Sequence, residues 1–381
     1  MRRALFTPDH EAFRRTVRRF VADEVVPGYE DWERTGHLPR ELFRKMGVAG
    51  LLGMAIPERY GGAGTPDYRY NVVLQEEAAR ALVTLGTVRT QLEVVLPYFL
   101  TYTDEEQRRR WLPGLASGRL LSAIAMTEPG TGSDLAGIRT TAVRDGDHYV
   151  LNGAKTFITG GLLADLVIVV ARTSTDPRDR RAGLTLLVVE DGVPGFGRGR
   201  PLDKMGLKVQ DTVELSFDDV RVPCANRLGG EGQAFRYLGN NLPQERMAVA
   251  VGSVAQTRAA LDLTVAHVRE PGAPGLPAAS QNSKFELAAV AAETEAAQTM
   301  LDRAVLGLVD GTLRAADAAM VKLFCTEVQG RAVDRCLQLF GDCGRSVPRA
   351  MLRMYADARV TRIYAGTSEV MKLIIAKSLG L

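Results

Sequence analysis

The chain has 381 residues, of which 46% are hydrophobic and 24% charged, and its formal net charge is +3. This length predicts two or three domains, and the balance of apolar and charged residues is typical of a folded soluble protein. The small net charge excludes the basic surface of a nucleic-acid-binding protein, and apolar runs such as 164–171 (ADLVIVVA) are too short to span a bilayer.

The cysteines and histidines show no pattern of a disulfide framework or a metal site. Cys224, Cys325, Cys336 and Cys343 include no CxxC pair, and the histidines are scattered along the chain. The first residues (MRRALF) are too short for a signal peptide, and acidic residues follow them directly. We therefore expect a cytoplasmic protein without a metal.

Residues 1–120 have the apolar periodicity of helices. Thr7 and Pro8 fit a helix start, and Phe13, Val17 and Phe20 then recur at helical spacing. We expect three further helices. The first covers 38–46 and ends at Gly47, the second begins at Pro66, and the third covers 104–112 and ends at Pro113-Gly114.

Between 121 and 228 the pattern changes to short apolar runs separated by Gly- and Pro-rich loops, which is typical of strands. Asp145-Gly146 predicts a hairpin that joins strands 140–144 and 148–151, and Asn152-Gly153 is a second turn signal. Further strands are expected at 166–171, 184–190 and 213–217. The region has the size of one compact β domain.

From 229 to the end the chain is predicted to be helical again. Long alanine-rich stretches cover 235–269, 284–309 and 315–340, and a shorter one ends near Leu379. Three long helices and a shorter one are typical of an antiparallel bundle.

One acid, Glu245, lies beside Arg246 in the stretch 240–247 (NNLPQERM). Pro243 fits the first turn of a helix and Asn240-Asn241 offers cap oxygens, so we expect Glu245 in the first turn of a long helix. A helix N-terminus favours a carboxylate and an apolar cleft disfavours its charge, and between these two influences a carboxylate can act as a general base near neutral pH. From this stretch alone, an ordinary pair of surface residues is the simpler interpretation.

Four short motifs suit a bound cofactor. Residues 124–133 (IAMTEPGTGS) form a Gly-rich turn whose hydroxyls and backbone N–H groups fit an anionic or carbonyl-rich ligand. Residues 157–159 (FIT) present an aromatic ring and a hydroxyl, and 338–344 (QLFGDCG) and 366–369 (GTSE) are Gly- or Thr-rich turns at helix ends. Taken singly, these are a polar loop, a plain strand and two helix caps.

In this order and spacing the motifs resemble the acyl-CoA dehydrogenase family. The matching segments are TEPGTGSD at 127–134, FIT at 157–159, QLFGDCG at 338–344 and AGTS at 365–368, with IPERYGG at 56–62, WLPGL at 111–115, NGAK at 152–155 and FDDVRVP at 217–223. The resemblance covers essentially the whole chain. It implies an α+β multidomain fold: an N-terminal α-helical domain (1–120), a middle β-barrel (121–228) and a C-terminal four-helix bundle (229–381).

The resemblance also implies FAD between barrel and bundle, and a homodimer or homotetramer paired through the bundles. The residues at the family's FAD-binding positions are, on the flavin side, Ile124, Met126, Thr127, Gly132, Ser133, Phe157, Ile158, Thr159, Gly366, Thr367 and Ser368 and, at the adenine end of the FAD bound by a neighbouring subunit, Arg269, Gln281, Gln338, Leu339 and Gly341. Ser133 and Arg246 match positions beside the substrate.

The family places its catalytic glutamate at one of two positions. One precedes the GTS triplet, where this chain has Ala365, and the other is on the first long bundle helix, where this chain has Glu245 in an LPQER stretch similar to that of long-chain-type members. The resemblance implies that Glu245 removes the proton α to a thioester carbonyl while the β-carbon passes a hydride to flavin N5, giving a trans-2-enoyl thioester. The thioester oxygen would accept hydrogen bonds from the flavin ribose and from the backbone N–H of the base.

The implied partners are an acyl thioester of CoA or of an acyl carrier protein, and electron-transfer flavoprotein or a similar acceptor, in fatty acid or secondary metabolism. Pro271–Ser280 replaces the family's Phe-Gly after Arg269, and Asp342 replaces a glycine; both departures predict weaker FAD binding. Two alternatives stay open: a flavin-dependent monooxygenase or oxidase on the same fold, and a non-catalytic acyl-binding homologue.

Overall fold

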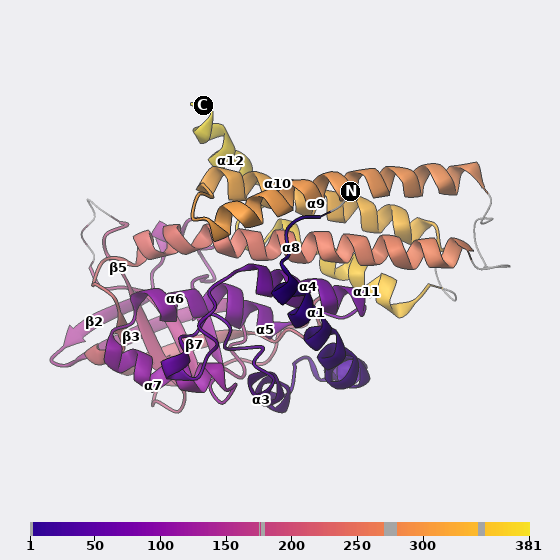
Figure 1. The fold of residues 1–381 in the computed structure, drawn as a ribbon. Helices are drawn as coiled ribbons and strands as arrows, with labels where there is room; N and C mark the ends of the chain where they lie inside the picture. Colours follow the sequence, from indigo (N-terminus) through magenta and orange to yellow (C-terminus); the bar gives the residue numbers. More distant parts are fainter. Residues whose placement is uncertain (1–2, 175, 177–179, 270–279, 342–346) are drawn as a thin grey trace.

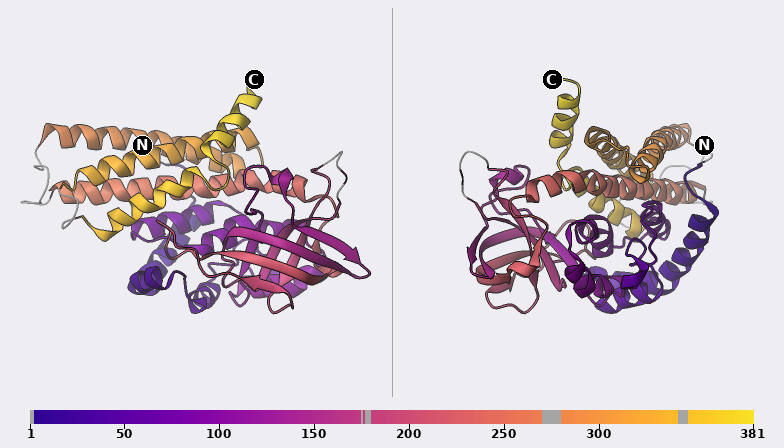
Figure 2. Two further views of the ribbon diagram at one scale, coloured as in Figure 1. Left: turned by 180° about the vertical axis from the view of Figure 1, so that it is seen from behind. Right: turned by 60° about the vertical axis from the view of Figure 1, so that its left-hand side comes forward.

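The structure is a computed structural model that describes residues 3–174, 176, 180–269, 280–341 and 347–381. A bundle of long helices from the C-terminal part lies across the sheet and the N-terminal helices, which sit side by side beneath it (Figures 1 and 2). Pro271, Gly272, Asp342 and Cys343, on which two of the sequence expectations depend, lie outside the described residues.

The N-terminal region is helical, as predicted, and its first helix begins at Pro8. The helices are α1 Pro8–Phe20, α2 Tyr29–Thr35, α3 Arg40–Val48, α4 Arg69–Arg80, α5 Thr87–Arg89, α6 Leu96–Tyr102 and α7 Glu105–Ala116, and a π-helical segment, Thr90–Val95, joins α5 to α6. The predicted end of α3 at Gly47 is wrong, because the helix continues to Val48. The predicted start at Pro66 is also wrong, because α4 begins at Arg69.

The expected end of α7 at Pro113-Gly114 is wrong as well. The helix runs on to Ala116 with Pro113 inside it, and Trp111, Leu112 and Leu115 are buried in the core. A proline removes one backbone hydrogen bond, and here the tertiary packing of the apolar face outweighs that loss.

The middle region forms one eight-stranded sheet with the order β6-β7-β3-β2-β4-β5-β8, and β1 pairs with β4 outside this path. The strands are β1 Ser122–Ala125, β2 Thr141–Asp145, β3 His148–Thr159, β4 Leu166–Arg172, β5 Leu184–Glu190, β6 Phe196–Arg198, β7 Thr212–Pro223 and β8 Arg227–Leu228. The short strands β6 and β8 are two free edges that do not pair with each other. The sheet is therefore not closed, and the expected β-barrel is wrong in that respect.

The two turn signals in this region have different outcomes. The hairpin at Asp145-Gly146 is confirmed, since β2 and β3 pair antiparallel up to Asp145 and His148. Asn152-Gly153 is not a turn: β3 continues through it, and its register against β7 shifts between Leu151 and Gly153. A Cβ at Gly153 would lie 2.8 Å from Thr140 Cα, so the glycine marks a β-bulge where two backbones come close.

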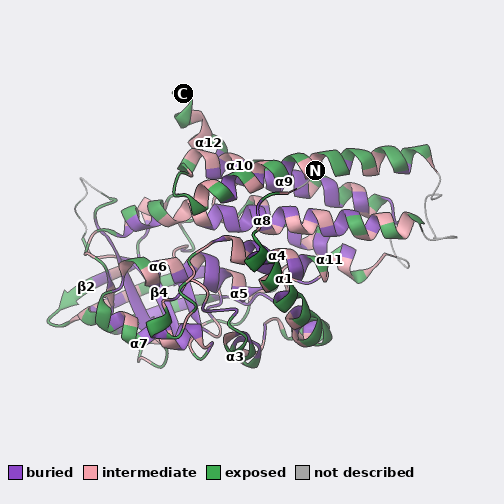
Figure 3. Cartoon of the chain, viewed as in Figure 1, coloured by how far each residue is buried: buried purple, intermediate pink, exposed green. Residues whose placement is uncertain are grey.

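Strands β4 and β5 are buried on both faces, which explains their uninterrupted apolar runs, whereas β2, β3 and β7 contain exposed residues. In β4, Leu166, Ile168 and Val170 pack with the N-terminal helices, and the alternate residues Val167 and Val169 belong to a second core. This is the two-residue period of a strand with a core on each side (Figure 3).

The C-terminal region is a bundle of α8 Ala234–Arg269, α9 Gln281–Val309 and α10 Ala315–Gln338, followed by α11 Arg349–Ala358 and α12 Ser368–Ser378. The predicted helical stretch 235–269 is confirmed, since α8 begins at Ala234, but the expectation that Glu245 lies in the first turn of a helix near Pro243 is wrong, because α8 contains Pro243. Ala234, Tyr237 and Leu238 are buried in the same core as the N-terminal helices, so tertiary packing holds the turns before the proline.

The described cysteines Cys224, Cys325 and Cys336 carry free thiols. Over the described ranges, no helix combines the length and the apolar character needed to cross a bilayer. The domain boundaries expected at 120/121 and 228/229 fall between α7 and β1 and between β8 and α8, and they stay predictions.

Candidate active site

Glu245 lies inside α8 and is only 6% exposed. The Tyr98 hydroxyl of α6 donates a hydrogen bond to Glu245 Oε1 at 3.1 Å. Burial raises the pKa of Glu245 to about 7, against the opposing effects of the Tyr98 hydrogen bond and the Arg246 charge. The carboxyl therefore changes charge near neutral pH because it is buried, and not because it lies at a helix N-terminus as we expected.

Arg246 is a buried cation beside this carboxyl, and a second buried cation, Lys322, lies within the influence of Arg246. Arg246 is 6% exposed, and its Nε has no hydrogen-bond partner among the described residues. Lys322 of α10 donates from Nζ to the Gly366 carbonyl at 2.8 Å, and burial, together with the charge of Arg246, lowers its pKa to about 8. A buried donor without a partner favours a ligand that supplies an acceptor.

The segment before α12 brings a backbone donor to the same region. Ala365 has a φ of 53° and Gly366 a φ of 97°, a turn that places Thr367 to accept from Val370 N as the cap of α12. Within the described chain, the Ala365 N–H donates no hydrogen bond. The N–H of Glu245 lies in the interior of α8, where the carbonyl four residues earlier accepts it. The expected backbone donor is thus occupied at Glu245 and available at Ala365.

A buried ion pair fixes the start of the Gly-rich turn onto β3. Lys155 Nζ lies 2.9 Å from Glu128 Oε1 and 3.0 Å from the Met126 carbonyl. Glu128 also accepts from the backbone N–H groups of Arg139 at 2.7 Å and Thr140 at 2.9 Å. The pKa of Glu128 is lowered, since these donors outweigh the effect of its burial. The buried Glu128 carboxylate therefore holds the Gly-rich turn against β3 and the segment at Arg139 and Thr140.

The upper part of this turn is exposed. Thr127 is partly exposed, and Gly132 and Ser133 are exposed. A Cβ on Gly130 would meet no atom within 4 Å, so the surface above the turn is open. Ile124 at the end of β1 is buried beneath the turn.

Phe157 extends this open surface along β3. Its side chain is 67% exposed, and its backbone has a φ of 58°, which is unfavourable for an L-residue other than glycine. The neighbouring Ile158 is buried, and Thr159 Oγ1 accepts from Gln210 Nε2 at 3.2 Å. An aromatic side chain held in this position offers a flat apolar face to a planar ring.

The predicted adenine-end residues lie far from the predicted flavin-side residues within one chain. Arg269 ends α8, Gln281 begins α9 and Gln338 ends α10, and all three are exposed at the end of the bundle away from the sheet (Figure 1). Gly341 follows them, and Leu339 is buried. Ser368 and the rest of its motif lie at the opposite end, where Ser368 Oγ donates to Glu327 at 2.8 Å.

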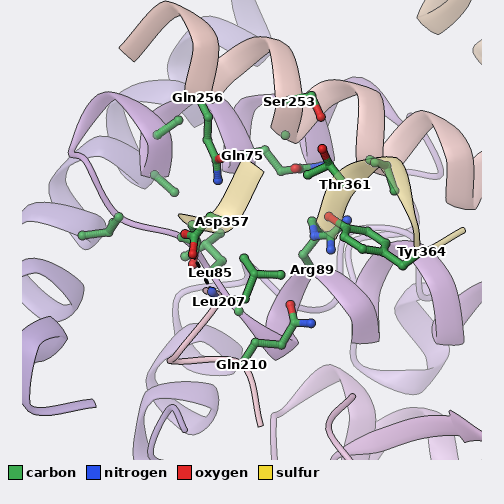
Figure 4. Close-up of a pocket in the computed structure, with 17 residues that line it drawn as sticks. Gln75, Leu85, Arg89, Leu207, Gln210, Ser253, Gln256, Asp357, Thr361 and Tyr364 are labelled. Carbon is green, nitrogen blue, oxygen red and sulfur yellow. Dashed lines mark hydrogen bonds between the residues drawn. The ribbon is translucent and has the colours of Figure 1, made fainter. Parts of the chain in front are cut away.

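Sequence reasoning missed a cavity with both polar and apolar lining residues, which begins about one helical turn after Glu245 on α8. Val249, Gly252, Ser253 and Gln256 line it from the face of α8 that also carries Glu245. The cavity has a volume of ≈ 50 Å³, and Arg89 and Tyr364 lie side by side on its wall (Figure 4). The signal in the sequence is weak: Arg89 and Glu93 are single charged residues in the otherwise uncharged run 87–99 (TVRTQLEVVLPYF).

Family models match nearly the whole chain. They are the acyl-CoA dehydrogenase N-terminal domain over residues 7–119, the middle domain over 123–220 and the C-terminal domain over 232–380. The chain is 40% identical over 378 residues to the mitochondrial long-chain specific acyl-CoA dehydrogenase of Sus scrofa, covering 99% of this chain and 88% of that protein.

Solved structures are similar over the same extent. A crystal structure of an acyl-CoA dehydrogenase from Geobacillus kaustophilus superposes with a TM-score of 0.95 at 42% identity, covering 99% of each chain. A glutaryl-CoA dehydrogenase from Mycobacterium smegmatis in complex with FADH2 gives a TM-score of 0.89 at 29% identity, covering 98% of this chain and 95% of that one.

Proposed function

The chain belongs to the acyl-CoA dehydrogenase family, and we propose that it catalyses the FAD-dependent α,β-dehydrogenation of an acyl thioester to the trans-2-enoyl thioester. The observation that carries this proposal is Glu245, a buried carboxyl whose pKa is raised to about 7 by burial. A base with this pKa is suited to take up a proton near neutral pH.

The residues present fit FAD. Phe157 offers an exposed aromatic face, and the open turn around Gly130–Ser133 leaves room for backbone contacts to a phosphate-bearing group. We propose that Ile124, Met126, Thr127, Gly132, Ser133, Phe157, Ile158, Thr159, Gly366, Thr367 and Ser368 hold its flavin side. When bound, FAD supplies the acceptor for the hydride that leaves the β-carbon.

In the proposed reaction, the protein positions the thioester and removes its α-proton. Glu245 Oε2 takes the proton while Tyr98 holds Oε1. The Ala365 N–H donates to the thioester oxygen, which stabilises the enolate-like charge that develops as the proton leaves. Arg246 borders the thioester and offers its partnerless Nε. The α-proton stays on Glu245, and the burial of that carboxyl keeps water away.

We further propose that the substrate is a CoA thioester, that electron-transfer flavoprotein or a similar protein reoxidises the cofactor, and that two or four copies associate through their bundles. The position of Arg269, Gln281, Gln338 and Gly341 supports association, because these residues can meet the same FAD as the flavin-side residues only if they come from another copy. A carrier-protein thioester is the alternative substrate.

Anaerobic mixing of the flavin-loaded protein with a panel of acyl-CoA thioesters tests the function. We expect bleaching of the flavin absorbance and formation of the enoyl thioester without oxygen consumption. Rapid reoxidation of the bleached flavin when oxygen is admitted, with oxygen consumed in continued turnover, would instead support the oxidase or monooxygenase alternative. The absence of bleaching with every acyl-CoA and carrier-protein thioester would contradict the proposal.

A further inference from the structure

The cavity that begins beyond Glu245 on α8 contains a cation without a direct counter-ion. Arg89 forms no ion pair with any described residue, although it lines the cavity and is largely withdrawn from solvent. Its guanidinium carbon lies 5.5 Å from the centre of the Tyr364 ring. Arg89 also donates a side-chain hydrogen bond to Tyr364, so part of the guanidinium is engaged within the chain, and its remaining donors favour an acceptor from outside.

Two acidic residues are close to this cavity, and both are engaged elsewhere. Asp357 lines the cavity and accepts from the backbone N–H of Leu207, and the charge of Glu93 acts on Arg89. Glu93 accepts from the Tyr68 hydroxyl at 2.5 Å and from Gln75 Nε2 at 2.7 Å. Burial raises the pKa of Glu93 to about 7, even though the charge of Arg89 opposes this. Glu93 and Arg89 therefore interact electrostatically, but they do not form a direct ion pair.

A second cavity residue also lacks a partner. The hydroxyl of Ser253 is buried, and no described residue forms a hydrogen bond with its Oγ. Ser253 comes from α8, whereas Arg89 comes from α5, so the two donors approach the cavity from different walls (Figure 4). A buried hydroxyl without a partner costs free energy unless a ligand or water satisfies it.

The lining of the cavity begins at Val249, about one helical turn after Glu245 on α8. Gln75, which binds Glu93, also donates to the Ala248 carbonyl at 3.2 Å, only three residues after Glu245 on α8. The cavity itself is lined by α8 from Val249 to Gln256, which is about 6 to 16 Å beyond Glu245 at 1.5 Å per residue. A thioester whose α-carbon faces Glu245 would thus direct the far end of a short acyl chain toward Arg89 and Ser253.

We propose that the acyl group accepted by this enzyme is short and ends in an oxygen function, a carboxylate or a hydroxyl, that accepts hydrogen bonds from Arg89 and bonds to Ser253. This inference rests on the proposed function and specifies its substrate class. A methyl end would leave the Ser253 hydroxyl without a partner and the remaining Arg89 donors without an acceptor, which is the situation in which sites built from polar groups discriminate most strongly.

The test compares matched series of CoA thioesters: butanoyl, pentanoyl and hexanoyl chains with their ω-carboxy and ω-hydroxy counterparts. Dissociation constants are measured by calorimetry on the oxidised, flavin-loaded enzyme with the non-oxidisable 3-thia forms, and flavin bleaching is measured with the ordinary thioesters. We expect at least one oxygen-ended series to bind on the order of 10- to 100-fold more tightly than the methyl-ended series of equal length, as for a hydrogen bond to a charged donor. A carboxylate preference and a hydroxyl preference both support the proposal and identify the group.

Variants assign the preference to Arg89. Arg89→Met keeps the length of the side chain and should abolish the preference, and Arg89→Lys should restore part of it. Arg19→Met, at an exposed arginine of α1, is the matched control and should leave the preference unchanged. If Arg89→Met proves unstable, Ser253→Ala provides a second variant, for which we expect a smaller loss of preference.

Equal or tighter binding of the methyl-ended series by the unmodified enzyme would overturn the inference while leaving the proposed function intact. An oxygen preference that survives unchanged in Arg89→Met and Ser253→Ala would overturn it too. If no thioester bleaches the flavin, the proposed function fails, and the calorimetric preference still decides whether this cavity binds an oxygen-ended chain.

Discussion

The side of the site that handles the proton and the side that would hold the cofactor are built in different ways. Glu245, Tyr98 and Arg246 are buried, and one chain brings them together. Phe157 and Ser133 are exposed, and the predicted adenine-end residues lie at the other end of the bundle. In the proposed function, burial within one chain therefore sets the pKa of the base in advance, while the proposed cofactor side depends on surfaces that FAD and a second copy would complete.

The largest effect is expected at the buried side. Glu245→Gln keeps the size and the Tyr98 contact but cannot take up a proton, so we expect turnover to fall by roughly 10²- to 10⁴-fold, the usual loss for a positioned base. Steady-state kinetics measure turnover, and flavin absorbance checks that FAD still binds. Glu58→Gln, at an exposed position, should turn over normally. Near-normal turnover of Glu245→Gln would show that another group is the base.

Mixing two impaired variants tests whether the cofactor side is shared between copies. One variant is Glu245→Gln, and the other combines Arg269→Ala, Gln281→Ala and Gln338→Ala, three exposed positions where substitution should not disturb folding. In a mixed dimer, one site would combine an intact Glu245 with intact adenine-end residues from the partner. We therefore expect activity after subunit exchange that exceeds the sum of the two variants.

No recovery of activity, with mixed dimers verified by differently tagged chains, would contradict the sharing of one FAD between copies. A triple variant that alone retains the FAD affinity of the parent protein would contradict the assignment of these residues to the adenine end.

The next effect is expected at the exposed face of β3. Phe157→Ala should weaken FAD binding by roughly 3- to 10-fold, because an aromatic pair contributes about 0.5–1.5 kcal/mol beyond its buried area. Titration of the apo-protein with FAD measures this. Phe157→Gly should bind FAD as weakly as Phe157→Ala does. Its free energy of unfolding should be about 1 kcal/mol higher than that of Phe157→Ala, because glycine adopts a φ of 58° without a steric penalty. Unchanged FAD affinity in both variants would contradict the proposal that Phe157 contacts FAD.

The smallest effect is a shift in pH dependence on the buried side. Glu245 has to be deprotonated to act as a base, so kcat/KM should rise with pH through about 7, the pKa that burial sets. The Tyr98 hydrogen bond stabilises the carboxylate and lowers this pKa, so Tyr98→Phe should move the rise to higher pH and reduce activity at pH 7. A rise that moves to lower pH in Tyr98→Phe would mean that another group controls it.

The sequence predicts the two sides of the site to different degrees. The motif at 124–133 and the strand at 184–190 could be read directly, since local turn chemistry and apolar runs specify them, and β5 spans the predicted residues. The surroundings of Glu245 could not, because Pro243 and Asn240-Asn241 resemble a helix start while the burial of Ala234 and Tyr237 extends α8 backward. Local patterns do not contain that long-range packing.

The cavity shows the same limit. Arg89, Glu93 and Gln75 belong to no motif, and they come together only because Gln75 of α4 bonds both Glu93 and the Ala248 carbonyl of α8. The open sheet is a further case, since the uninterrupted apolar run in β4 predicts a buried strand and says nothing about whether the outer strands meet.

The ion pair of Lys155 and Glu128 beneath the Gly-rich turn has a consequence for protein engineering. Removal of one partner leaves a buried charge, with a cost of about 3–5 kcal/mol. Joint replacement by apolar residues removes both charges but leaves the backbone N–H groups of Arg139 and Thr140 and the Met126 carbonyl without these partners, so neither position is expected to tolerate change freely. A designer who grafts residues 124–133 onto another scaffold therefore has to carry Lys155 and the segment around Arg139 and Thr140 with them.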